Sequence, residues 1–88
     1  MSDEGRLLEK RSQGEVAQAV LENTLFKEAV EHVRNAAYKQ FKSSAAGEEG
    51  RAERDVAHMK IRVLEDIVTR LTKHMKDGQR SAKALIEE

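Results

Sequence analysis

Residues 57–75, AHMKIRVLEDIVTRLTKHM, decide the fold of this 88-residue chain. Apolar side chains recur along this stretch at alternating steps of four and three residues. We call these positions the seam: Ala57, Ile61, Leu64, Val68, Leu71 and Met75. Their average spacing of about 3.5 residues places them on one side of a helix and is typical of helices that pack against another helix. The seam therefore predicts helix–helix association and says little about chemistry.

The helix that carries the seam is expected to run from about residue 51 to residue 77. A second apolar row lies beside the seam, and together the two rows predict a wide buried face. We call this row the second stripe: Ala52, Val56, Met59, Val63 and Ile67. Gly78 follows a basic turn, which is typical of the residue just beyond a helix C-terminus. A short amphipathic tail helix is expected after it, over residues 80–87.

The rest of the chain predicts two further helices. One covers about residues 25–42 and has its own apolar stripe: Phe26, Val30, Val33, Ala37 and Phe41. Residues 43–50, SSAAGEEG, read as the turn of a hairpin because they combine glycine, serine and acidic residues. A helix is also expected over about residues 6–22, but Gly14 costs roughly 1 kcal/mol in a helix interior and makes that helix a poor packing partner. Residues 1–5 are expected to be disordered.

The predicted fold is all-α, a long antiparallel helical hairpin with a shorter N-terminal helix, in a single domain over residues 6–88. At 1.5 Å per residue the third helix is roughly 39 Å long and the second roughly 27 Å, so part of the seam overhangs the hairpin. Leu71 and Met75 stay exposed unless the first helix, the tail or another subunit covers them. Because an exposed apolar seam usually marks an interface, we favour self-association into a helical bundle. The residues expected to carry it are Ile61, Leu64, Val68, Leu71 and Met75, with Phe26, Val30, Val33 and Phe41 across the hairpin.

Composition narrows the classes of function. The chain has no cysteine, which excludes disulfides and thiolate zinc sites. Its sixteen basic residues balance sixteen acidic ones, so no overall field attracts nucleic acid or an anionic membrane. No apolar run approaches the ~20 residues of a membrane span, and the first residues lack the apolar core of a signal peptide. We expect a protein without membrane contact.

No catalytic pattern stands out. The serines lie in predicted termini and turns, away from any nucleophile elbow, and glycine-rich phosphate loops are missing. Asp55 and His58 have the spacing of a metal-binding Asp-x-x-His pair, but a carboxylate-bridged site needs several such groups. An exposed histidine beside a salt-bridging aspartate is the preferred interpretation. The sequence therefore predicts neither an enzyme nor a metal or other cofactor.

A basic cluster near the C-terminus is the best nucleic-acid signal. It consists of Arg70, Lys73, Lys76, Arg80 and Lys83. These side chains could contact phosphates, although no aromatic residue is interleaved for base stacking. The preferred interpretation is a solvated helix end whose cations complement the helix dipole.

Several segments together resemble a family of small, uncharacterised helical proteins encoded in tailed-phage and prophage genomes. They are LENTLFKEA at 21–29, Tyr38, Phe41, EGRAER at 49–54 and HMKDG at 74–78. The resemblance covers about residues 20–85. It implies a viral or prophage origin and an accessory or assembly role, in the cytoplasm of a host cell or associated with a virion. It implies no activity and no site residues.

The expected function is that of a noncatalytic, phage-type accessory or assembly protein. It would form a homo-oligomer and bind other phage or host proteins through its helices. The alternative is a DNA-binding oligomer, such as a small subunit of a packaging machine, that uses the basic cluster. The sequence leaves open the identity of the partner, the number of subunits and the orientation of the helices.

Overall fold

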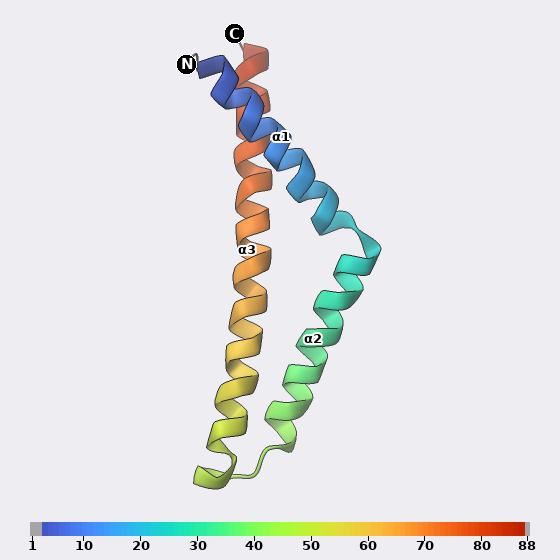
Figure 1. The fold of residues 1–88 in the computed structure, drawn as a ribbon, viewed down its shortest axis with the longest axis vertical. Coiled ribbons are helices and arrows are strands. Elements are labelled where there is room, and N and C mark those ends of the chain that lie inside the picture. Colours follow the sequence, from blue (N-terminus) through green and yellow to red (C-terminus); the bar gives the residue numbers. More distant parts are fainter. Residues whose placement is uncertain (1–2, 88) are drawn as a thin grey trace. The chain divides into compact units, whose positions relative to one another are not determined.

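The computed structural model describes residues 3–87, and within that range it is built from helices without a strand (Figure 1). The elements are α1 (Asp3–Glu22), α2 (Thr24–Ser43), the 3₁₀ helix η1 (Gly47–Gly50) and α3 (Arg51–Glu87). The all-α class is thus confirmed. The first helix is not the shorter one that was predicted, because α1 and α2 each have 20 residues. Residues 3–5, expected to be disordered, belong to α1, and the same expectation for residues 1–2 lies outside the described part of the chain.

The chain divides into two compact units where the sequence predicts one domain. The hairpin unit, Thr24–Ile67, contains α2, η1 and the first part of α3. Its two long helices run antiparallel, as the sequence predicts (Figure 1). The terminal unit combines α1 and Asn23 with the part of α3 that begins at Val68. Each unit is therefore essentially a pair of helices.

The predicted break at Gly78 is wrong, since α3 continues through it to Glu87. A glycine that ends a helix usually adopts a left-handed backbone conformation. Among the described residues only Gly47 has a positive φ, and Gly78 is instead a buried position inside the helix. Gly78 follows Met75 by three residues and precedes Ala82 by four, so it extends the seam. The predicted tail helix is accordingly the last part of α3.

The prediction that Gly14 weakens α1 as a packing partner is also wrong. Gly14 is buried within a continuous α1, and it faces Gly78 of α3 in the terminal unit. A Cβ placed on Gly14 would lie 2.6 Å from the Gly78 Cα and 2.9 Å from the His74 carbonyl oxygen. The missing side chains thus let the two helix backbones touch, which is the physical reason for a glycine at a helix crossing.

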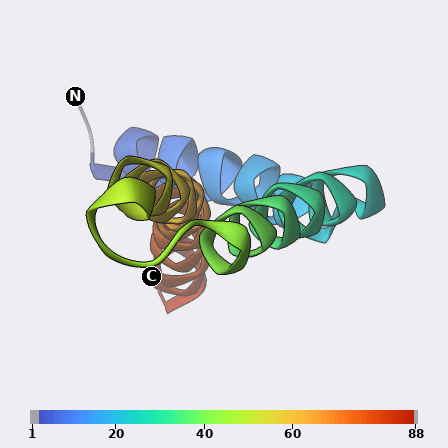
Figure 2. The ribbon, with the colours of Figure 1, turned by 90° about the horizontal axis from the view of Figure 1, so that it is seen from below.

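The turn between α2 and α3 lies within the predicted segment and depends on glycine and arginine (Figure 2). Gly47 has a φ of 75°, a conformation that few other residues tolerate. A Cβ on Gly50 would overlap the carbonyl group of Ala45. From the first turn of α3, Arg54 donates hydrogen bonds to the carbonyl oxygens of Ala45 and Gly47, the latter at 2.6 Å. One guanidinium therefore fixes the turn to the start of α3.

Small residues form the most buried part of the chain. Among the described residues, the buried ones are Gly14, Ala17, Ala37, Gly50, Ala57, Gly78 and Ser81. No large side chain is fully buried in the described part of the chain. Helix pairs whose closest contacts are alanine and glycine approach tightly but enclose little apolar volume. Larger apolar side chains are left to flank these contacts.

Candidate association surface

The seam is the least exposed side of α3. Its larger members are half-buried: Ile61, Leu64, Val68, Leu71 and Met75. In the hairpin unit Leu64 lines a groove with Val33 of α2. In the terminal unit Leu71 borders a hollow with Ala17 of α1, and Met75 borders another with Gly14. The seam thus faces helices of the same chain, and its role in self-association stays a prediction.

The second stripe is exposed, which corrects the prediction of a wide buried face. The exposed fractions are 44% for Val56, 63% for Met59, 59% for Val63 and 45% for Ile67. Ala52 is exposed as well. The stripe lies roughly a third of a turn around α3 from the seam, at about 100° per residue. Within the hairpin unit, α2 packs on the seam side of this part of α3 and leaves the second stripe open.

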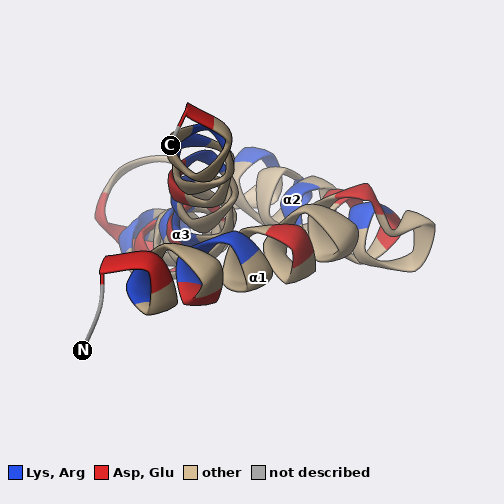
Figure 3. Ribbon diagram, turned by 90° about the horizontal axis from the view of Figure 1, so that it is seen from above, with Lys and Arg blue, Asp and Glu red and all other residues tan. Residues whose placement is uncertain are grey.

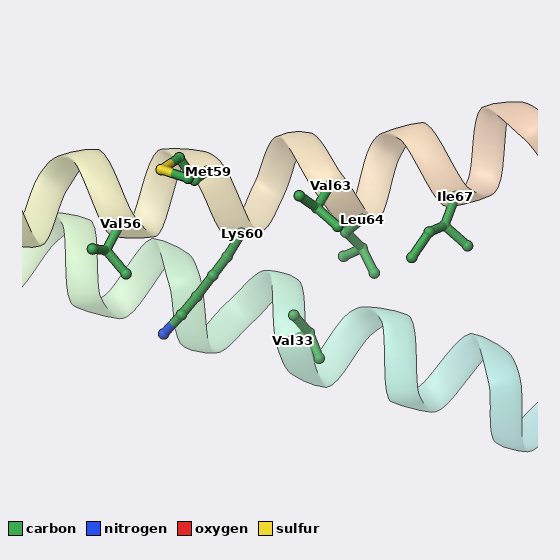
Figure 4. A pocket seen from close by; sticks show the side chains of 7 residues that line it. All are labelled: Val33, Val56, Met59, Lys60, Val63, Leu64 and Ile67. Carbon is green, nitrogen blue, oxygen red and sulfur yellow. The ribbon is translucent and has the colours of Figure 1, made fainter.

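A groove follows the second stripe along the hairpin unit (Figure 4). It has a volume of about 470 Å³ and is lined by Val33, Val56, Met59, Lys60, Val63, Leu64 and Ile67. Lys60 is its single charged lining residue. The Lys60 ammonium extends toward α2 and donates a hydrogen bond of 3.0 Å to the Gln40 side chain, so its aliphatic stem borders the groove. The groove is therefore apolar along its length and polar only at one edge.

On α2 the predicted contacts across the hairpin are only partly realised. Phe26 and Val30 are half-buried, but Val33 is 39% exposed and Phe41 is 46% exposed. The buried position of α2 is Ala37. Since the most buried residues of this unit are alanines and glycine, the helices meet at small side chains and Val33 and Phe41 stand at the side of the contact.

The basic cluster is exposed at all five of its positions. Carboxylates on the same helix lie within ion-pairing distance of Arg80, which is 2.9 Å from Asp77, and of Lys83, which is 3.9 Å from Glu87. Acidic and basic positions also alternate along α1 (Figure 3). The terminal unit therefore presents charges of both signs rather than a uniform positive field.

The remaining candidate chemistry stays dispersed. Asp55 and His58 are both exposed, and residues 3–87 bring no three His, Cys, Asp or Glu side chains together in a way that could hold a metal ion. The two hollows of the terminal unit have volumes of about 190 Å³ and 400 Å³ and are lined by short segments of α1 and α3. In the described part of the chain, no helix is both long and apolar enough to cross a bilayer.

Comparison of the chain with protein-family models, with curated proteins and with solved structures gives no match. The candidate site therefore rests on the geometry of the chain itself.

Sequence reasoning found the residues of the second stripe but placed them in the core. Comparing the number of apolar rows with the number of helices available to cover them could have corrected this placement. The seam and the second stripe both run along residues 52–67, yet the hairpin offers one helix to cover them. One partner helix covers one row, so the other row had to remain open.

Proposed function

We propose that this protein is noncatalytic and acts through helix-mediated association, with the second stripe as its contact surface. The observation that supports this proposal is an exposed apolar groove with four large side chains of α3 in a row. Monomeric proteins seldom expose contiguous apolar surface of this kind unless it serves an interaction.

The shape of the groove favours a helix as its occupant. Six of its seven lining residues come from α3 at helical spacing, and the antiparallel α2 contributes Val33. An amphipathic helix can place its own apolar row in such a groove, with anchors three and four residues apart. A polar edge at Lys60 would then remain in contact with water.

The proposal includes an accessory or assembly role in a phage or prophage setting. Its support is the resemblance of residues 20–85 to small phage-encoded helical proteins, together with a surface suited to protein partners. Such a role depends on a surface that binds other proteins and does not require catalytic side chains.

Val63→Asp tests the surface directly. We expect the wild-type chain to sediment as an oligomer whose fraction rises with concentration, and the variant to sediment as a monomer with unchanged helical circular dichroism. The physical reason is that a carboxylate in the centre of an apolar contact must lose its water on association. Asn35→Asp is the matched control, because it adds a carboxylate at an exposed position of α2 that does not line the groove.

Leu64→Asp separates association from folding in the same experiment. Leu64 belongs to the half-buried seam, so a charge there opposes the packing of α2 on α3. We expect a loss of roughly 2–4 kcal/mol of folding free energy and a largely unfolded chain. If Val63→Asp keeps the wild-type sedimentation profile over the whole concentration range, the second stripe is not the association surface.

A further inference from the structure

We infer that the occupant of the groove is the second stripe of another copy of this chain, packed antiparallel with a two-fold axis near Met59. This inference rests on the proposed function and goes beyond it, because it names the partner and the register.

The second stripe is close to symmetric about its middle residue. Val56 precedes Met59 by three residues and Val63 follows it by four. Ala52 precedes it by seven residues and Ile67 follows it by eight. A two-fold axis perpendicular to α3 at this point therefore sets Val56 opposite Val63 of the other copy. It also sets the small Ala52 opposite the large Ile67, which lets the two rows interdigitate.

A row of alternating charge runs along one side of the second stripe. We call it the charged row: Arg51, Asp55, Arg62 and Asp66, all of them exposed. Read in order, the signs are plus, minus, plus and minus. Reversing the row about a point between His58 and Met59 places Arg51 opposite Asp66 and Asp55 opposite Arg62. Both pairs share this midpoint, and it lies within one residue of the midpoint of the stripe.

Helix orientation decides whether the charged row meets itself. In an antiparallel two-fold pair, the same side of each helix faces its counterpart, so the charged row of one copy lies along the charged row of the other. In a parallel pair it faces the opposite side of the stripe, where Lys60 extends toward α2. Only the antiparallel arrangement therefore gives four attractive pairs, two on each side of the axis. Pairs at a rim add little affinity and mainly select the orientation.

Single cysteine variants test the register cleanly, because the natural chain has no cysteine. Met59→Cys lies near the axis, so we expect mild oxidation with diamide to convert it to a disulfide-linked dimer. Ala52→Cys and Ile67→Cys should each stay uncrosslinked alone, since each thiol is then about 20 Å from its own copy along the helices. An equal mixture of these two variants should give the mixed disulfide. Glu65→Cys measures random collision, because Glu65 is exposed and lies two residues after Val63, about 160° away around α3.

A charge-swap pair provides a second readout in reduced, unmodified protein. Asp55→Arg sets an arginine against Arg62 of the other copy on each side of the axis, and we expect the dimer Kd to rise about 3- to 30-fold at low salt. Adding Arg62→Asp restores opposite charges and should return the Kd to near the wild-type value.

The outcomes separate this inference from the proposed function. Self-crosslinking of Ala52→Cys and of Ile67→Cys, without the mixed product, would show a parallel pair and overturn the register while the surface stands. A wild-type chain that stays monomeric at every concentration overturns both. A dimer that crosslinks at none of these stripe positions also overturns both. If Met59→Cys weakens the dimer itself, the mixture of the other two variants still decides the register.

Discussion

Gly14 and Gly78 show how a single missing atom sets a helix crossing. Neither residue adopts a conformation that needs glycine for its backbone, because both lie inside helices. What they supply is space: each would place a Cβ 2.6 Å from the other's Cα. Real Cβ atoms do not approach a backbone that closely, so any larger residue must separate the helices.

Gly78→Ala is expected to destabilise the terminal unit despite its better helix propensity. The gain of about 1 kcal/mol from removing a helical glycine is opposed by a clash with the Gly14 backbone, which cannot rotate away. We expect a net loss of about 1–2 kcal/mol, measured by chemical denaturation followed by circular dichroism. Thr69→Ala, at an exposed position of α3, should instead raise the free energy of unfolding by a few tenths of a kcal/mol. A Gly78→Ala variant more stable than wild type would contradict the crossing.

The sequence could not distinguish these two functions of glycine. After a basic turn, Gly78 has the composition of a helix end, and Gly14 looks like a flaw in a weak helix. Each glycine is needed because the other lies opposite it at the helix crossing, although the two are 64 residues apart in the chain. The one local clue was register, because Gly78, Ala82 and Leu85 continue the spacing of the seam.

At the scale of elements, the seam was predicted well because its period is a local property of one helix. The face that it marks is the least exposed face of α3. The fate of the second stripe was not local. It depended on how many helices pack on residues 51–67, and the hairpin unit supplies only α2. Val56, Met59 and Val63 therefore have the helical spacing typical of core residues, but they lie on the surface.

The turn between α2 and α3 depends on the planar head of Arg54. Its Nη1 and Nη2 atoms donate hydrogen bonds to separate carbonyl oxygens, those of Ala45 and Gly47. A lysine at this position has one ammonium and cannot hold both in the same geometry. We expect Arg54→Lys to reduce the free energy of unfolding by about 1 kcal/mol in this exposed setting, measured by urea denaturation. Arg51 forms a 3.5 Å ion pair with the exposed Glu48, and Arg51→Lys should change the free energy of unfolding by much less.

At the scale of the whole molecule, the sequence placed Leu71 and Met75 beyond the reach of the hairpin and favoured another subunit to cover them. In the structure both belong to the terminal unit, where they border hollows lined by α1. The first helix, one of the covers that the sequence allowed, thus lies beside them. The third helix does extend beyond the hairpin, as its expected length indicated. Treating Gly14 as a defect, however, favoured another subunit over the first helix as the element that packs on these residues.

Charge balance sets the expectation for nucleic acid. With sixteen basic and sixteen acidic residues, and with ion pairs at Arg80 and Lys83, we expect only weak binding to duplex DNA at about 0.15 M salt. Fluorescence anisotropy at low and moderate salt measures it. Tight binding with a steep salt dependence, lost on replacing Arg70, Lys73 and Arg80, would instead favour the packaging-type alternative.

The scarcity of large buried side chains also has a calorimetric consequence. The heat capacity change of unfolding comes mainly from newly hydrated apolar surface, at about 12–15 cal/mol/K per residue in ordinary globular domains. Here the buried residues are glycines, alanines and a serine and the larger apolar side chains are at most half-buried, so a single subunit has less such surface to hydrate on unfolding. Its stability curve should accordingly be flatter than that of a typical domain of this length. Cold should weaken the isolated subunit less than it weakens proteins with a thick aliphatic interior.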